Sequence, residues 1–274
     1  MATLVGGFCL PHNPLIVGAP DAAAPEPAAR VMAAFEQVKQ RIAALRADTV
    51  VVIGDDHYTL FGTQCAPSIL IGIGDVEGPI EPWLNIARRP VANHPALAEH
   101  LMDTGLDQGF DWAVAKTLVL DHSVMVPIHL SVPDGVRAIP IYISSGVKPF
   151  IRGRRCLALG RMLGEAIAAW PGEERVVVLG TGGISHWVGM ADMGRVNQEF
   201  DQRILGLVEQ GELQALAALG DDDIIEQGGN GALEIRNWLV ALAALQSYEA
   251  RVLHYEPLEA WITGLGFVEM AVAA

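Results

Sequence analysis

Short runs of β-branched and other apolar residues alternate along the chain with longer segments in which apolar residues recur every three or four positions. Such runs are typical of buried strands, and the recurrent spacing is typical of helices that bury one face. Strands are predicted at residues 2–9, 49–53, 68–73, 137–144, 175–180, 250–254 and 266–272. Helices are predicted at about 27–46, 95–106, 154–169, 194–210 and 231–247.

The clearest helical pattern covers residues 27–46, where one apolar stripe combines Val31, Phe35, Val38, Ile42 and Leu45. The Pro-rich stretch at 18–29 is expected to be a loop leading into this helix. Because strands and helices alternate, the pattern favours an α/β fold with a central mixed or mostly parallel sheet and helices on both faces. No Pro-, Gly- or Ser-rich linker divides the chain and no internal repeat is visible, so a single domain is predicted over residues 1–274.

The composition adds a cellular context to this picture. The chain is 51% hydrophobic, yet no stretch reaches the roughly 18 uninterrupted apolar residues that a membrane helix requires. The N-terminal segment MATLVGGFCLPHNP has no basic region and is interrupted by prolines, so no signal peptide is predicted. Cys9, Cys65 and Cys156 are too few and too scattered for a disulfide framework or a zinc cluster. We therefore expect a cytoplasmic protein with reduced thiols and no membrane partner.

The formal net charge is −14, with 32 acidic and 18 basic side chains. This balance argues against a nucleic-acid partner, because phosphate contacts require a basic face. The one basic cluster, IRGRRC at 151–156, is expected to begin a surface helix; a docking patch for a partner or an anionic ligand is the alternative.

Three of the eight histidines follow predicted strands. His12 comes after strand 2–9, His57 after 49–53 and His186 after 175–180. In open α/β sheets ligands bind beyond the carboxyl ends of the strands, where loops from different strands become neighbours. A single histidine in such a loop is most simply a turn residue or a satisfied core residue. Three in equivalent positions predict a shared site.

Glu234 follows the glycine-rich segment 228–231 and opens an apolar helix. A glutamate there stabilises the helix N-terminus by its charge, or it joins the histidines as a ligand. Two neutral imidazoles and one carboxylate form the facial triad of non-haem Fe(II) oxygenases, but zinc hydrolysis accepts the same set. No local signature such as H-E-x-x-H is present, so the residue types leave iron and zinc open.

Asp55 and Asp56 stand between the second strand and His57. Either aspartate could orient a metal-bound histidine or close the turn by accepting hydrogen bonds from the backbone.

The strand and glycines of VVVLGTGGIS resemble a phosphate loop, but both G-x-G-x-x-G and G-x-x-x-x-G-K-[ST] are absent. GDDDII at 220–225 is read as the acidic start of a short helix rather than a calcium site.

Four segments carry a resemblance to a known family: LPHNPLI, GDDHYTLF, GTGGISHWVG and GGNGALEIRNWL. They resemble, in the same order, the signature segments of the class III extradiol ring-cleavage dioxygenases, a family typified by the large (beta) catalytic subunit of protocatechuate 4,5-dioxygenase. The similarity extends from about residue 5 to the closing EPLEAWITGLGFVEM. Each segment is a weak signal singly, whereas four in order over nearly the whole chain are a strong one.

The resemblance implies roles for individual residues. His12, His57 and Glu234 match the ligands of Fe(II), and His186 matches the acid–base catalyst of the family. LDHSVMVPIHL resembles the segment with a further pocket histidine, His122; alternatively, Asp121 or a backbone carbonyl satisfies this ring beneath the pocket.

The resemblance also implies a reaction and a substrate class. O₂ is expected to cleave the ring beside the diol, in a catecholic substrate such as protocatechuate, a gallate or a substituted catechol. The C-terminal segment near the substrate suggests Trp261 and Thr263 as contacts, and Tyr58 is either a pocket residue or a packing residue. Relatives differ in using a small partner subunit, so a homo-oligomer such as a dimer, or a complex with that subunit, is expected. The alternatives are a metalloenzyme of the same scaffold that acts on an aminophenol or uses zinc, and a non-catalytic subunit. Retention of all four key residues counts against the last alternative.

Overall fold

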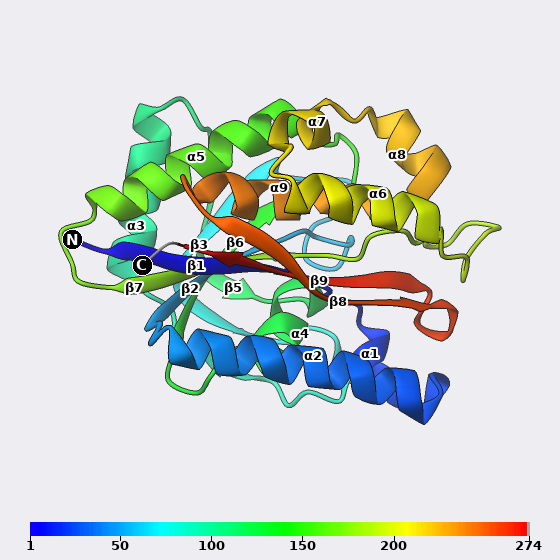
Figure 1. Ribbon diagram of the computed structural model, residues 1–274. Helices are drawn as coiled ribbons and strands as arrows, with labels where there is room; N and C mark the ends of the chain where they lie inside the picture. The colour runs from blue at the N-terminus through cyan, green and yellow to red at the C-terminus, as the bar shows by residue number, and fades with distance from the viewer. Residues whose placement is uncertain (273–274) are drawn as a thin grey trace.

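The computed structural model describes residues 1–272, and its centre is a mixed sheet built from the predicted apolar runs (Figure 1). The predicted single domain, 1–274, ends with two residues outside the described ones. Within the described residues the sheet has nine strands: β1 (Thr3–Leu10), β2 (Thr49–Gly54), β3 (Ile69–Gly78), β4 (Arg89–Val91), β5 (Ala113–Val119), β6 (Arg137–Ile143), β7 (Arg175–Thr181), β8 (Glu249–Leu258) and β9 (Thr263–Ala271).

The strand order is β4-β3-β6-β2-β7-β1-β9-β8, with β5 paired to β3 outside this path. The neighbours β6, β2, β7 and β1 run parallel, whereas β3 pairs antiparallel with β6, and β9 pairs antiparallel with β1 and β8. The prediction of a mixed sheet is confirmed. Because parallel strands end at the same edge, the carboxyl ends of β2, β7 and β1 lie next to one another.

Helices cover both faces of the sheet, as the alternation predicts (Figure 1). On one face lie α3 (Pro95–Asp107), α5 (Gly153–Ala169), α6 (Gln198–Glu209), α7 (Leu213–Ala218), α8 (Asp221–Gly228) and α9 (Ile235–Ala244). On the other lie α1 (Leu15–Gly18), α2 (Pro25–Ala44) and α4 (His122–Ser131). Short 3₁₀ turns complete the chain: η1 (Pro20–Ala22), η2 (Pro82–Leu84), η3 (Gly231–Glu234) and η4 (Glu259–Trp261).

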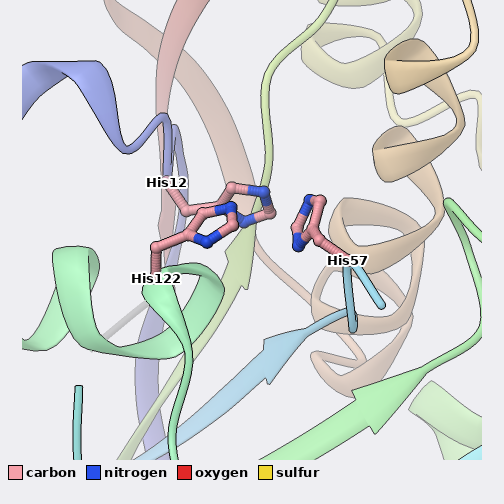
Figure 2. A group of neighbouring side chains, drawn as sticks. All are labelled: His12, His57 and His122. Atoms are coloured by element: carbon pink, nitrogen blue, oxygen red, sulfur yellow. The ribbon is translucent and has the colours of Figure 1, made fainter. Parts of the chain in front are cut away.

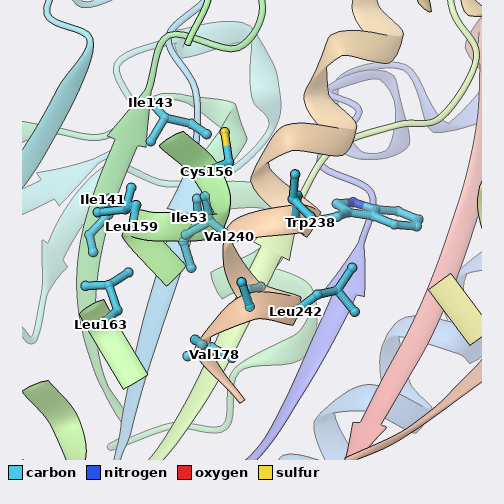
Figure 3. Close-up of a cluster of buried hydrophobic side chains, with 14 of the residues drawn as sticks. Ile53, Ile141, Ile143, Cys156, Leu159, Leu163, Val178, Trp238, Val240 and Leu242 are labelled. Atoms are coloured by element: carbon cyan, nitrogen blue, oxygen red, sulfur yellow. The ribbon is translucent and has the colours of Figure 1, made fainter. Parts of the chain in front are cut away.

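The interior positions of the central strands are mostly apolar because both faces of these strands are buried. In β2, Val51 and Ile53 pack into the core under α5 and α9, whereas Val50 and Val52 pack into the core under α2 and α4. Figure 3 shows the first of these cores, in which Leu159 of α5 and Val240 of α9 meet the sheet residues. Two apolar cores therefore hold the central strands fixed from both sides.

The sequence pattern does not predict β4, β5 or α4. β4 has three residues, and β5 is a partly exposed strand whose Ala and Lys residues weaken its strand signal. α4 is buried along most of its length and contains Pro127, so it shows no amphipathic stripe and a helix-breaking residue. Tertiary contacts therefore decide these three elements.

Helix boundaries also differ from the prediction. α2 begins at Pro25, so residues 25–29 are helical where a loop was expected, because proline is tolerated in the first helical turn, where its missing N–H has no partner. α6 and α9 are shorter than the predicted 194–210 and 231–247. The Asn197 side chain accepts the backbone N–H of Phe200 and thereby sets the start of α6. No helix within residues 1–272 combines the length and apolarity needed to cross a membrane.

Candidate metal centre and active site

Three histidine rings converge beyond the carboxyl ends of the parallel strands (Figure 2). His12 follows β1, His57 follows β2, and His122 opens α4. The ring centroids of His57 and His122 are 4.3 Å apart, and that of His12 is 5.2 Å from His57 and 5.6 Å from His122. The parallel sheet therefore brings together residues from three separate parts of the chain.

The Glu234 carboxylate, at the end of η3, faces the same point. Its Oε2 lies 3.2 Å from His12 Nε2 and its Oε1 lies 3.2 Å from His57 Nε2. The backbone N–H of Gly183 donates to Oε2 at 2.7 Å and fixes the carboxylate. Burial alone would raise the pKa of Glu234, but the His12 and His186 imidazoles outweigh it and hold the pKa well below its usual range. Glu234 is therefore an anion in a buried site.

Hydrogen bonds fix the tautomers of both candidate histidine ligands. Thr181 Oγ1 lies 3.0 Å from His12 Nδ1, and it also lies within 3.0 Å of the carbonyl oxygens of Ile53 and Ser123. The hydroxyl has one proton to give to a carbonyl, so it accepts the Nδ1 proton of His12. His57 Nδ1 likewise donates to Asp121 Oδ2 at 3.3 Å. In both rings Nε2 is left as a lone-pair donor that faces Glu234.

Two ring nitrogens and a carboxylate thus point their lone pairs at one another. Within the described residues, His12 Nε2 has no hydrogen-bond partner although it is buried. Facing acceptors are unfavourable unless a cation lies between them. Neutral imidazoles and a carboxylate are ligands for divalent iron or zinc, so these three residues fit a metal ion.

The electrostatics of His57 agree with a site for a cation. Burial lowers the pKa of His57, but the carboxylates of Asp55, Asp121 and Glu234 outweigh burial and raise that pKa well above its usual value. Asp55 is fully buried, accepts an N–H of Asn237 at 2.7 Å, and has its Oδ2 3.8 Å from His57 Nε2. The negative surroundings favour a positive charge at this point, whether a proton or a metal ion carries it.

The two aspartates after β2 have different environments. Asp56 accepts backbone N–H groups of Tyr58, Thr59 and Leu60 and therefore closes the turn. Asp55 makes no such turn contact within the described residues, and its carboxylate lies within the same group of possible metal ligands as His12, His57 and Glu234.

His186 lies on the other side of Glu234. Its Nδ1 donates to the carbonyl of Ile184 at 3.2 Å, and its Nε2 lies 3.3 Å from Glu234 Oε1. Burial lowers the pKa of His186, but Glu234 outweighs burial, so the pKa is raised. A side chain at Gly231 would collide with this ring, so η3 can approach His186 only because residue 231 is glycine.

His122 is held by a residue that the sequence pattern does not indicate. Its Nδ1 donates to Glu81 Oε1 at 2.6 Å, whereas Asp121 Oδ2 lies 4.0 Å away. Burial and the neighbouring His57 lower the pKa of His122, and the bond to Glu81 opposes this without reversing it. The contact with Glu81 leaves Nε2 of His122 as a proton acceptor.

The sequence pattern did not identify three residues that hold the histidine rings in place: Glu81, Thr181, and Asp121 in its role as the partner of His57. Thr181 has a usable signal, because it is a polar residue at the end of an apolar strand. Asp121 has one as the N-cap of α4, where it accepts the N–H of Ser123. Glu81 lies in an irregular segment before η2 and has no recognisable motif.

A cavity of about 560 Å³ opens above these groups. His12, His57, His122, His186 and Glu234 all line it, together with Tyr58 and Thr263. Trp261 does not line it; its indole is buried and donates to the carbonyl of Ala19. The structure therefore brings seven of the eight predicted site residues to one cavity.

Residues 6–266 match the family described as the catalytic LigB subunit of aromatic ring-opening dioxygenase. The chain belongs to this family and is an extradiol ring-cleavage dioxygenase, as the resemblance of its four segments implies.

Among its relatives is a protein of Photorhabdus laumondii named 2,3-dihydroxyphenylpropionate/2,3-dihydroxicinnamic acid 1,2-dioxygenase, which is 26% identical over 95% of each chain. A protein of the same name from Paraburkholderia phymatum is 29% identical over 94% of each chain. The fold is similar to that of an uncharacterised Escherichia coli K12 protein, JW3007, with a TM-score of 0.62 at 14% identity over 97% of this chain and 100% of that one.

Proposed function

We propose that this chain is a single catalytic domain that uses Fe(II) and O₂ to cleave the ring of a substituted catechol. The carbon–carbon bond beside the diol breaks, and both atoms of O₂ enter the ring-opened product. The observation that carries the proposal is the convergence of His12 Nε2, His57 Nε2 and the Glu234 carboxylate, three lone-pair donors that face one another in a buried site.

These three residues would hold the metal on one side of the cavity. Bound Fe(II) would supply open coordination positions for the catechol oxygens and for dioxygen, and would acidify the catechol hydroxyls. Thr181 and Asp121 accept the Nδ1 protons of His12 and His57, which orients both rings and directs their Nε2 atoms toward the metal position.

Two further histidines would move protons. His122 Nε2, a free acceptor with a lowered pKa, is suited to receive a catechol proton. His186, whose pKa is raised by Glu234, is suited to return a proton to oxygen as the ring opens. Environments that push the pKa values of two neighbouring groups apart are the usual basis for dividing acid and base roles.

Thr263 and Tyr58 would contact the substrate from the cavity wall. Trp261 lies outside the cavity, but its backbone carbonyl accepts an N–H of Asn13 and would thereby position that cavity-lining side chain. A second copy of the chain or a small subunit would cover the open cavity. Cys9, Cys65 and Cys156 are all free thiols, which supports a reducing compartment such as the cytoplasm.

Anaerobic reconstitution followed by oxygen uptake tests the proposal. The protein loaded with Fe(II) should consume O₂ with a catechol panel and form yellow ring-fission products, and protein loaded with Zn(II) should not. Aminophenols serve as the second arm of the panel. Absence of O₂ uptake with every catechol, or equal activity with zinc, would contradict the proposal.

A further inference from the structure

Within residues 1–272, the cavity is lined by acidic side chains and histidines but by no lysine or arginine. Its charged lining residues besides histidine are Glu81 and Glu234. The relatives are named for substrates that carry a carboxylate, which needs a cation or several N–H donors when it is buried. The described residues of this cavity offer a substrate carboxylate no lysine or arginine side chain.

Glu81 makes the cavity unfavourable for an anionic substituent. The residue is 7% exposed, and its Oε1 accepts the Nδ1 proton of His122. Its Oε2 is buried and has no hydrogen-bond partner within residues 1–272. Because Glu81 lines the cavity, a substrate carboxylate there would lie beside an acceptor group rather than a donor.

Two arginines lie two residues from cavity-lining residues in the sequence, and both make their contacts outside the cavity. Arg236 follows Glu234 by two residues, but it is buried and pairs with Asp221. Arg195 follows Met193 by two residues, but its guanidinium stacks over the ring of Trp187, 4.8 Å from the centroid. Neither Arg195 nor Trp187 lines the cavity. The stacking places the charge over an aromatic face instead of over the open site.

The mouth of the cavity is apolar and incompletely covered. Trp83 is 49% exposed, Val188 46% and Met193 55%, and all three line the cavity. Leu15 and Ile262 extend the same wall. Large apolar side chains that remain half exposed around a site provide surface that an apolar ligand group can bury.

We infer that the substrate is a catechol whose ring substituent is uncharged and apolar, an alkyl or aryl group, and that this substituent packs against Trp83, Val188 and Met193. The inference rests on the proposed function, because it assumes that the diol faces His12, His57 and Glu234. By this inference, the substrate of this chain differs from those for which the relatives are named in the charge of its ring substituent, whereas the reaction is the same.

A matched pair of ligands tests the inference. 3-Propylcatechol and 2,3-dihydroxyphenylpropionate have substituents of similar size. The two substituents differ only at their end, which is a methyl group in the first ligand and a carboxylate in the second. We expect the metal-loaded protein, under anaerobic conditions in a calorimeter, to bind 3-propylcatechol at least about tenfold more tightly, within the range that one apolar contact provides. Equal or tighter binding of the carboxylated ligand would overturn the inference.

Oxygen uptake separates this result from a failure of the proposed function. The anaerobic binding ratio judges the substituent, whereas O₂ consumption with unsubstituted catechol judges the reaction. A protein that cleaves catechol but prefers 2,3-dihydroxyphenylpropionate would retain the proposed function and refute the inference.

A variant locates the substituent. Trp83→Ala should reduce the ratio of 3-propylcatechol to catechol affinity by roughly tenfold, because the apolar wall is lost. Leu106→Ala is the matched control: Leu106 is 51% exposed on α3 and does not line the cavity, so the ratio should stay unchanged. An unchanged ratio in Trp83→Ala would contradict the placement of the substituent.

Discussion

At the scale of single residues, His57 illustrates how a loop histidine becomes a ligand candidate. Its Nδ1 proton goes to Asp121 and its Nε2 faces Glu234, so one ring nitrogen is held by the protein and the other is directed into the site. The same division holds for His12 between Thr181 and Glu234. A carboxylate or hydroxyl partner behind each ring sets the tautomer that a metal requires.

The substitution His57→Ala should abolish metal binding and activity while the protein stays folded. The loss should exceed the about 10–100-fold that removal of an outer partner of a metal ligand costs, because a ligand itself is removed. Metal content by elemental analysis, with circular dichroism as the control for folding, checks this. Full metal content in the folded variant would exclude His57 as a ligand.

Glu81→Gln should impair proton transfer without removing metal. The Glu81 carboxylate raises the pKa of His122 relative to what burial alone would produce, so its neutralisation should lower that pKa further. His122 would then stay unprotonated to lower pH, and the acidic limb of the kcat/KM profile should move to lower pH. We expect kcat to fall by about 10–100-fold, because general-base catalysis weakens when the base is weaker and less well oriented.

Metal content that matches the wild type separates this effect from a damaged site. The position of the acidic limb is the decisive readout, since a purely structural role of Glu81 would lower the rate without moving the limb.

At the scale of elements, the approach of η3 to the loop after β7 depends on glycines. Gly229 adopts a positive φ of 88°, and Gly231 leaves room for the ring of His186. This loop presents Glu234 at the end of η3, directly before α9. The sequence GGNG is therefore required for close packing rather than for flexibility.

Gly231→Ala should displace the His186 ring and lower kcat by roughly 100-fold, the cost of misplacing a reacting group by about 1 Å. Metal content should be affected less than kcat, because His186 is not among the proposed ligands. Gly206→Ala is the control: this glycine lies within α6, a new methyl group would meet no tight contact, and the helix should gain about 0.4–1 kcal/mol. Normal kcat in Gly231→Ala would refute the steric argument.

At the scale of the whole molecule, the site connects parts of the chain that are far apart in sequence. His12, His57 and Glu234 come from the ends of β1 and β2 and from the turn before α9. A metal ion held by all three would bind the folded chain and not the unfolded one, so it adds to the free energy of unfolding.

Metal should therefore raise the melting temperature. At a free concentration of one hundred times Kd the gain is about 2.7 kcal/mol, which corresponds to roughly 5–10 °C for a chain of this size. Anaerobic thermal melts with Fe(II) and with a chelator measure the shift, and His57→Ala should show little of it. An equal shift in that variant would indicate that metal binds elsewhere.

The central strands could be predicted from the sequence because their pattern reports burial directly. Val50 to Ile53 are apolar at successive positions, a pattern typical of a strand that is buried on both faces. In the structure these residues are buried alternately in two different cores, as this pattern predicts. The position of His12, His57 and His186 just after such strands was enough to expect that they meet. Glu234 was also a candidate from its position, with capping as the alternative; the family resemblance then favoured the ligand role and added His122.

Other features were decided only by tertiary structure. Asp55 and Asp56 are adjacent and chemically identical, yet Asp56 closes a turn and Asp55 is fully buried beside His57. Glu81 contacts His122 across 41 residues, and no local pattern marks it. β5 and α4 likewise lack a clear period because their neighbours, rather than their own spacing, determine what they bury.

By itself, then, the sequence determined the class of fold and the strand ends where candidate ligands gather; the family resemblance supplied the proposed ligand set. Periodicity and residue type carry this information because they record local burial and the chemical nature of each side chain. The tertiary structure alone decided which carboxylate supports which histidine, and that no lysine or arginine among the described residues lines the cavity. Those contacts join residues distant in sequence, and only the path of the folded chain sets the distances between them.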